Sequence, residues 1–194
     1  AIGSDVITIE YSTNGGTTWD TIVPGITHVG TQDVKVRAKN PNYVTETCEY
    51  TLTVTKRSVT VAIAGHTSTT EYNGAAHTVT GYDITSISNA LYTSSDFTFS
   101  GSASASRTDT GTTNMGLAAS QFTNNNANFE VTFIVTDGWQ KITANEGALT
   151  LTCPSGTAIT KVYDDAALKP AASVTEAIGS DVITIEYSTN GGTT

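Results

Sequence analysis

Residues 1–18 and residues 177–194 carry the same sequence, AIGSDVITIEYSTNGGTT, and the second copy begins 176 positions after the first. Shared strand propensity cannot produce identity over 18 consecutive residues, whereas an array of near-identical units does. We therefore expect a tandem array with a unit of 176 residues. On this interpretation the chain begins and ends inside a unit.

The residue composition favours strands and turns over helices. Thr, Ser, Gly, Val and Tyr are abundant, while Leu, Met, Lys and Arg are sparse. Polar and apolar residues alternate in segments 6–11, 97–99 and 149–151, as in strands with one buried face. A chain of 194 residues suits two sandwich domains of about 100 residues each. The expected fold class is all-β, with immunoglobulin-like β-sandwich modules in tandem.

The charge distribution limits the partners of the chain. Its 18 acidic and 9 basic residues give a net charge of −9 and form no basic stripe that could neutralise phosphates. We therefore expect no nucleic acid partner. No run of 18 apolar residues and no basic-then-apolar leader occurs, so we expect no membrane insertion within this chain and place any secretion signal or anchor outside it.

A fainter repeat lies inside the 176-residue unit and predicts two modules of one ancestry. Three short motifs occur twice, in the same order once the next unit is counted. The first motif is a turn followed by a strand, the second opens a strand, and the third precedes a closing strand. The copies are 72–77 and 163–168 for the first motif, 111–112 and 30–31 for the second, and 126–129 and 40–43 for the third.

Taken together, the pattern Tyr-[Asp/Asn]-x-Ala-Ala, then Gly-Thr, then Asn-x-Asn-[Tyr/Phe] and a strand resembles the MBG-type and related bacterial immunoglobulin-like repeats of surface adhesins. The resemblance covers most of the chain. It implies a β-sandwich stalk segment of a secreted protein at the bacterial cell surface. It also implies no catalytic residues and no cofactor.

The motifs predict three segments. Residues 1–54 are the C-terminal half of a split module, residues 55–142 a complete module, and residues 143–194 the N-terminal half of the next split module. In the complete module we expect strands near 57–64, 76–82, 96–105, 112–118 and 130–136, with at most a single helical turn in 89–95 and in 117–122. Alternation assigns its core to Val61, Val79, Tyr82, Phe97, Phe99, Leu117, Val131, Phe133 and Val135.

Residues 12–19, STNGGTTW, resemble the Asp-box turn of sialidase propellers, with Asn14 in place of the usual Asp. A single copy cannot build a propeller, so we interpret the segment as a structural turn. Asn14 and Gly15 are expected to supply the positive φ angles, and Trp19 to fold back over the hairpin.

Cys48 and Cys153 are the only two cysteines, and each is expected in a strand of the split module. Cys153 precedes the Cys48 of the following unit by 71 positions, and a disulfide closing such a loop would stabilise the module by roughly 3–5 kcal/mol. The alternative is two buried free thiols. Neither cysteine has the spacing of a metal site.

His28, His66 and His77 are far apart in the sequence and are accompanied by no nucleophile elbow or His-Glu-x-x-His motif. Structural roles explain them. We assign no catalytic, cofactor-binding or metal-binding residues and expect that the chain is not an enzyme.

Asp164, Asp165 and Asp181 are the candidate ligands for a calcium ion at a junction, but they lack the run of alternating Asp and Asn residues of a calcium loop. Turn chemistry explains them equally well. We therefore assign no calcium site.

Lys161 with Asn40 or Asn42 could form an isopeptide bond of the kind that some adhesin sandwiches carry. Such a bond needs a buried acid beside the pair, and the sequence identifies none. We therefore assign no such bond.

The leading functional hypothesis is a stalk whose repeats project a distal binding domain. The alternative is a repeat that binds a host glycan or a host protein through loops near Trp19 or Tyr92. Trp139 is either a sugar-stacking platform or a residue packed at the junction between modules. The expected partners are neighbouring repeats, with residues 147–194 of one copy completing residues 1–54 of the next, head to tail.

Overall fold

The computed structural model describes residues 5–147, 149–156, 158–176, 178, 181–189 and 192. Within these residues, regular structure consists of β-strands and two short 3-10 turns, so the chain is all-β as predicted. Spatial contacts divide the chain into two compact units. Unit 1 comprises residues 1–63, 84–100 and 118–135, and unit 2 comprises residues 64–83, 101–117 and 136–194. The units do not follow the repeat, so the module bounds stay a prediction.

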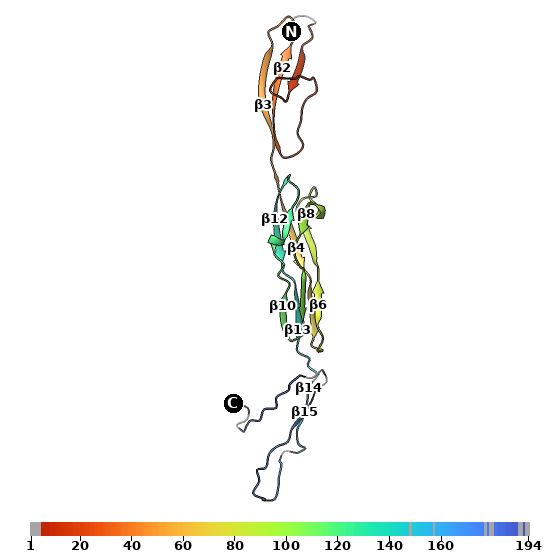
Figure 1. Ribbon diagram of the computed structural model, residues 1–194, viewed down its shortest axis with the longest axis vertical. Coiled ribbons are helices and arrows are strands. Elements are labelled where there is room, and N and C mark those ends of the chain that lie inside the picture. Colours follow the sequence, from red (N-terminus) through yellow and green to blue (C-terminus); the bar gives the residue numbers. More distant parts are fainter. Residues whose placement is uncertain are drawn as a thin grey trace. The chain divides into compact units, whose positions relative to one another are not determined.

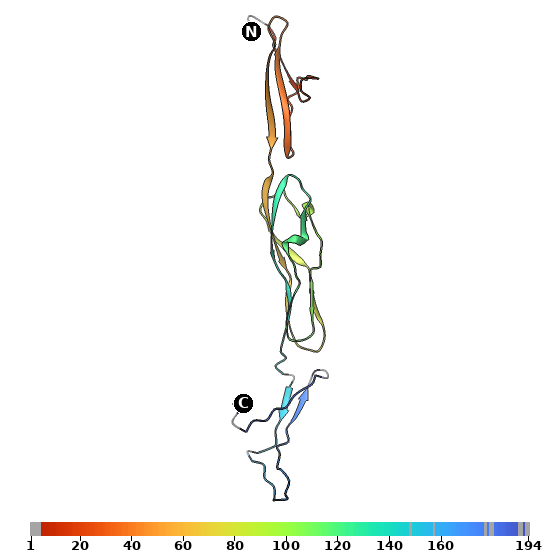
Figure 2. The ribbon, with the colours of Figure 1, turned by 60° about the vertical axis from the view of Figure 1, so that its left-hand side comes forward.

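Unit 1 begins with an antiparallel sheet of order β1-β2-β3 (Figure 1). The strands are β1 (Thr8–Ser12), β2 (Gly30–Lys39) and β3 (Glu46–Val54). Figure 2 shows β2 and β3 as a long pair of neighbouring strands. The register places Ile9 opposite Ala38 and Val34 opposite Tyr50.

Alternation gives this sheet one apolar and one charged face. On the charged face Arg37 forms an ion pair with Glu10 at 2.6 Å, and Lys35 forms one with Glu49 at 2.6 Å. Val34, on the opposite face, is 1% exposed. Val34, Val36 and Ala38 alternate with charged residues along β2 and lie on this apolar face.

The rest of unit 1 holds an aromatic core. The strand order is β12-β4-β7 in one sheet and β11-β8 in another. Phe97 packs edge-on against Phe122 and Phe133, and Tyr92 packs edge-on against Phe129. The elements are β4 (Arg57–Gly65), β7 (Tyr82–Ile87), η1 (Ser94–Asp96), β8 (Phe97–Phe99), η2 (Ala119–Gln121), β11 (Phe122–Asn124) and β12 (Phe129–Thr136).

In unit 2, β13 lies between an antiparallel neighbour, β10, and a parallel neighbour, β5. A second pair, β6 and β9, is antiparallel. Ile142 and Gln140 of β13 are each 1% exposed. The strands are β5 (Thr67–Glu71), β6 (His77–Thr80), β9 (Ser104–Arg107), β10 (Gly111–Asn114) and β13 (Trp139–Thr143).

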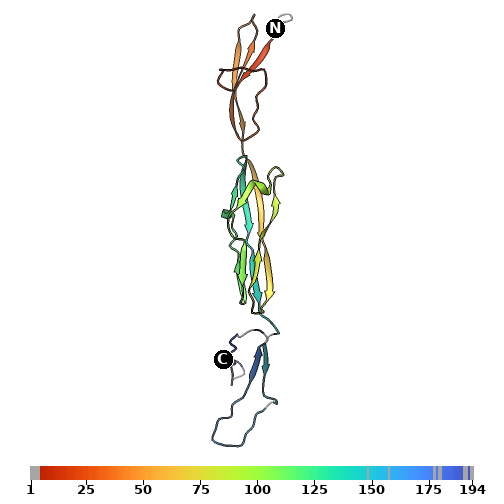
Figure 3. The ribbon, with the colours of Figure 1, turned by 45° about the vertical axis from the view of Figure 1, so that its right-hand side comes forward.

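The last paired strands of unit 2 are β14 (Leu149–Thr152) and β15 (Ser173–Glu176), which are antiparallel and appear in teal and blue in Figure 3. Leu151 lies opposite Val174. The described residues contain no helix long and apolar enough to cross a membrane.

The expected core is confirmed in its alternation. Val61, Phe97 and Leu117 are buried, and the other six expected residues are half-buried. The pattern missed several large buried residues. Ile63 lies in the expected strand β4, and the others lie next to turns or in the unexpected strand β13: Tyr92, Phe122, Phe129 and Ile142.

Several expected strand bounds were wrong. The strand expected at 112–118 ends at Asn114, and the left-handed Gly116 (φ 74°) follows it. The strand expected at 76–82 ends at Thr80, before Gly81 (φ 91°). The expected 96–105 strand is two strands, β8 and β9. The helical turn η2 lies inside the expected segment 117–122, whereas η1 begins inside the expected segment 89–95 and ends one residue beyond it, at Asp96.

Candidate functional site

The turn at residues 12–19 is organised by one buried hydroxyl. Ser12 is 3% exposed, and its Oγ accepts a hydrogen bond from the Gly16 backbone N–H at 2.9 Å. Asn14 Oδ1 accepts the Thr18 N–H at 2.9 Å, which closes the same turn from the other side. Tyr11 and Asp20 then pair through two backbone hydrogen bonds of 2.6 and 2.9 Å. The turn satisfies its own polar groups, as a structural turn must.

Trp19 folds back over this turn, as expected. Its Nε1–H donates to the Gly16 carbonyl at 2.9 Å, and the Arg37 guanidinium lies 4.1 Å from its ring centroid. The expected source of the positive φ angles was partly wrong, because they occur at Gly15 (73°) and Gly16 (97°) and not at Asn14. The two glycines tolerate the left-handed region without Cβ strain, so Asn14 is left to act through its side chain.

The first internal motif forms the same turn in both copies. Asn73 Oδ1 accepts the Ala75 N–H at 3.0 Å, and Asp164 Oδ1 accepts the Ala166 N–H at 3.0 Å. The residue between them is left-handed in each copy, with φ of 75° at Gly74 and 63° at Asp165. Only the first copy leads directly into a strand, β6. The expectation that both copies enter strands is therefore wrong for the second.

The third motif also repeats its hydrogen bonds. Asn126 Oδ1 accepts the Asn128 N–H at 3.1 Å, and Asn40 Oδ1 accepts the Asn42 N–H at 2.8 Å. In both copies the aromatic residue then donates its backbone N–H to the first Asn carbonyl, at 3.2 Å. These matching side-chain turns reinforce the interpretation of the two segments as copies of one motif.

The second copy of the 18-residue repeat reproduces part of its turn. The Ser188 Oγ accepts the Gly192 N–H at 2.8 Å, which matches the bond between Ser12 and Gly16. Residues 184–188 nevertheless form no strand, whereas the identical residues 8–12 form β1 against β2. A strand needs a partner for its backbone groups, and this explains the difference between the copies.

Both cysteines are free and exposed. Cys48 lies in β3, as expected, and Cys153 follows β14 directly. Neither thiol is buried in this chain, and the alternative of two buried free thiols in an assembled split module stays open. The expected bond joins Cys153 to the Cys48 of a following unit, and it stays a prediction.

The histidines have separate local partners. His66 Nδ1 lies 2.7 Å from the Thr80 carbonyl. His77 Nε2 lies 2.9 Å from Asn73 Oδ1, and the side chain of His28 lies 3.2 Å from that of Asn128. Among the described residues no group of three or more His, Cys, Asp and Glu side chains could hold a metal ion.

The aromatic residues considered for ligand binding are committed to packing. Tyr92 is 2% exposed, and its hydroxyl donates to Asn124 Oδ1 at 3.0 Å. The Tyr92 side chain itself is therefore not available to a ligand, while binding through loops near Trp19 or Tyr92 stays a prediction. Trp139 is half-buried and opens β13, opposite Asn114 of β10. It belongs to a strand inside a sheet and does not project from a linker.

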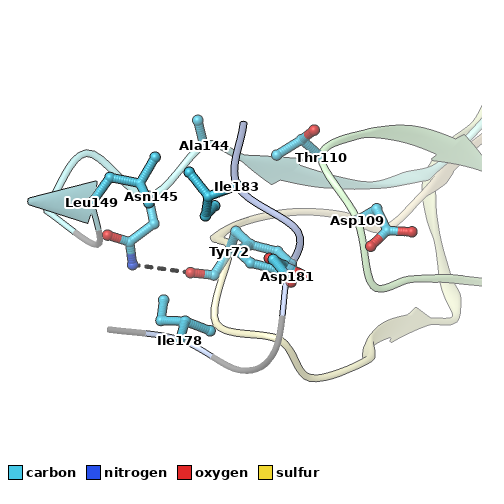
Figure 4. A pocket seen from close by; sticks show the side chains of 9 residues that line it. All are labelled: Tyr72, Asp109, Thr110, Ala144, Asn145, Leu149, Ile178, Asp181 and Ile183. Carbon is cyan, nitrogen blue, oxygen red and sulfur yellow. Dashed lines mark hydrogen bonds between the residues drawn. The ribbon is translucent and has the colours of Figure 1, made fainter. Parts of the chain in front are cut away.

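A cavity of about 270 Å³ lies in unit 2 beside Tyr72 (Figure 4). The Tyr72 hydroxyl donates to Asp181 Oδ2 at 2.7 Å, and Asn145 Nδ2 donates to the Tyr72 carbonyl at 3.0 Å. Ile178 and Ile183 complete an apolar side. These contacts join segments of unit 2, and we assign no catalytic group to the cavity.

The remaining candidates have structural partners as well. Lys161 forms an ion pair with Asp164, and Asp165 Oδ1 accepts the Tyr163 hydroxyl at 3.1 Å. Asn40 and Asn42 form the turn described above. These contacts lend no support to a calcium site or to an isopeptide bond.

No model of a protein family matches the chain, and no curated protein or solved structure matches it either.

Proposed function

We propose that the chain is a stalk or spacer segment of a bacterial cell-surface adhesin, built from immunoglobulin-like modules in tandem, which projects a distal binding domain. The observation that carries this proposal is the recurrence of side-chain turns. Asn73 and Asp164 occupy equivalent positions of the first motif, and each accepts the backbone N–H two residues later. Repeated local structure inside a 176-residue unit, itself marked by an exact 18-residue repeat, favours serial copies of one module.

Strand order in unit 2 suits a segment under tension. β5 precedes β13 in the chain, and the two strands pair in parallel over five residues, from Trp139 opposite Thr67 to Thr143 opposite Glu71. Pulling the chain from both ends slides these strands along each other. Because the strands are parallel, the N-terminal end of β5 and the C-terminal end of β13 lie at opposite ends of the pair. Pulling on these two ends therefore loads all five residue pairs at the same time.

The aromatic residues considered for ligand binding have structural contacts. Trp19 is held by Gly16 and Arg37, and Tyr92 is buried. Neither is presented as a binding aromatic, so the adhesive contact is assigned to a domain elsewhere in the protein. Secretion to the bacterial surface belongs to the same proposal and rests on the resemblance to adhesin repeats.

The parallel pairing of β5 with β13 is tested by single-molecule stretching in two directions. In one experiment the chain is held by its ends, which shears β5 against β13. In the other, handles are placed on the opposed and exposed residues Thr69 and Lys141, which peels the same pair apart. Both chains carry Cys48→Ser and Cys153→Ser, so that the handle cysteines are the only thiols. The proposal expects a higher rupture force in the first geometry, and an equal or lower force would contradict it.

The binding alternative is tested separately on a glycan array and a panel of host surface proteins. A stalk segment should give no reproducible hits. Reproducible binding that is lost in Trp19→Ala, and kept in the equally aromatic Trp19→Phe, would replace the stalk with a binding repeat.

A further inference from the structure

The β1-β2-β3 sheet has an apolar face that the described chain leaves partly uncovered. Ile9 is 51% exposed and Tyr50 is 42% exposed, although both lie on the face of the buried Val34. Ile7, two residues before Ile9, is 40% exposed. The other face is already occupied by ion pairs and by Trp19. The uncovered surface is thus the apolar one.

The β14–β15 hairpin has the same unbalanced construction. Leu149 and Leu151 are 56% and 59% exposed, and Val174 lies opposite Leu151 on their face. Thr150 and Thr152 alternate with them and point to the other face. A two-stranded hairpin of this kind is marginal in water unless its apolar face is covered.

The same sequence occurs at the sheet and beside the hairpin. Ile183 and Ile185 correspond to Ile7 and Ile9, with identical sequence around them. They line a cavity of about 240 Å³ together with Leu149, Leu151 and Val174. In the second copy, therefore, the isoleucines lie beside the hairpin. In the first copy the same isoleucines lie on a sheet and are exposed.

We propose that the Leu149, Leu151 and Val174 face of one copy of the chain packs on the Ile7 and Ile9 face of a second copy, which completes a sandwich between the two molecules. The occupant is a second copy because the sequence that already lies against the hairpin, residues 183–186, is repeated without change in residues 7–10. The contact is heterologous, so open chains of molecules form. The inference rests on the tandem arrangement in the proposed function and adds its contact surface.

When the second molecule binds, residues 183–186 are displaced from the β14–β15 hairpin, and β1 stays in its sheet. β1 is held on β2 by a five-residue register and by the Arg37–Glu10 ion pair at 2.6 Å. Among described residues 181–189 there is no strand. Moving Ile183 and Ile185 off the hairpin therefore breaks no strand pairing, whereas moving Ile9 breaks the backbone pairing of β1 with β2.

The first test compares the two faces of the hairpin. Sedimentation velocity over a concentration series of the whole chain should show mass that keeps rising with concentration. Leu151→Asp should weaken association at least about tenfold, because a charge would enter the apolar contact. Thr150→Asp, one residue away on the other face, should leave association unchanged. Equal effects of the two variants would overturn the proposal.

The second test uses the repeat as its own control. Ile9→Asp should weaken association at least about tenfold, while Ile185→Asp, in an identical sequence, should leave it unchanged or tighten it. Near-ultraviolet circular dichroism in a Trp139→Phe background, where Trp19 is the only tryptophan, verifies that the β1-β2-β3 sheet stays folded in Ile9→Asp. Weakening by Ile185→Asp as large as that by Ile9→Asp would overturn the proposal, and so would a strictly monomeric chain.

The outcome is independent of the stretching experiment. A monomeric chain whose β5–β13 pair still resists shear would refute the proposed contact between copies and leave the proposed stalk function standing. A chain that associates but ruptures at equal force in both pulling geometries would support the contact and contradict the stalk function.

Discussion

The backbones of Gly65 and Gly138 lie in direct contact, where β4 ends and β13 is about to begin. A Cβ at Gly65 would overlap the Gly138 backbone, and a Cβ at Gly138 would overlap the His66 carbonyl. The contact lets β5 and β13 lie side by side, as the hydrogen bond from the Trp139 N–H to the His66 carbonyl shows, at 3.2 Å. Glycine is required here for close approach and not for its φ angle.

We predict that Gly138→Ala lowers the free energy of unfolding by about 1–3 kcal/mol or more, since backbone atoms must separate to admit the methyl group. Gly25→Ala is the matched control, because no atom lies within 4 Å of its Cβ position. Urea denaturation of both variants gives the comparison. A Gly138→Ala midpoint equal to that of Gly25→Ala would show that the two backbones separate without loss.

A second prediction concerns the hydroxyl at the centre of the turn. Ser12→Ala should destabilise the β1-β2-β3 sheet by about 1–3 kcal/mol, because the Gly16 N–H would lose its acceptor in a buried site. Ser188→Ala makes the same change in the exposed second copy and should be nearly neutral. Hydrogen exchange of the β2 amides reports the local loss. The account of the turn fails if both substitutions have the same effect.

The alternation of Val131, Phe133 and Val135 was enough to predict β12, and Asn14 with Gly15 was enough to predict the turn, although not the positive φ angle of Gly16. β13 was missed because its buried Gln140 reverses the usual signal, with the side chain donating to Thr70 Oγ1 and to the Lys141 carbonyl. β5 was missed because its sequence, TSTTE, has no apolar residue. The stacking of Arg37 on Trp19 depends on the pairing of β1 with β2, which no local pattern contains.

A third prediction concerns pH. The Thr80 carbonyl first, and Asp83 second, raise the pKa of His66 above its ordinary value of 6.5. Protonated His66 therefore stabilises the fold fully below the unfolded pKa, and this contribution disappears as the pH rises through the folded pKa. Denaturation midpoints measured between about pH 5 and pH 8 should fall with pH more steeply in the native chain than in His66→Gln. Parallel curves for the two chains would contradict the assignment.

A fourth prediction follows from the position of the cysteines. Cys48 lies opposite Val36 on the apolar side of its sheet, and Cys153 continues the alternation of Leu149 and Leu151. Mixing a Cys48→Ser chain with a Cys153→Ser chain under mild oxidation should give a disulfide-linked pair. Each variant alone should give much less, because it would have to join two like cysteines. Equal yields in all three samples, on a non-reducing gel, would show that the two cysteines do not face each other across the contact.

The tandem organisation is tested most directly by stretching a chain in which residues 1–176 are followed by residues 1–194. Three unfolding events are expected, two from the complete modules and one from the split module, which is assembled from residues 147–176 and the following residues 1–54. The third event should release at most about 300 Å of chain, at about 3.5 Å per residue. Two events of a single length, with no third, would contradict the account.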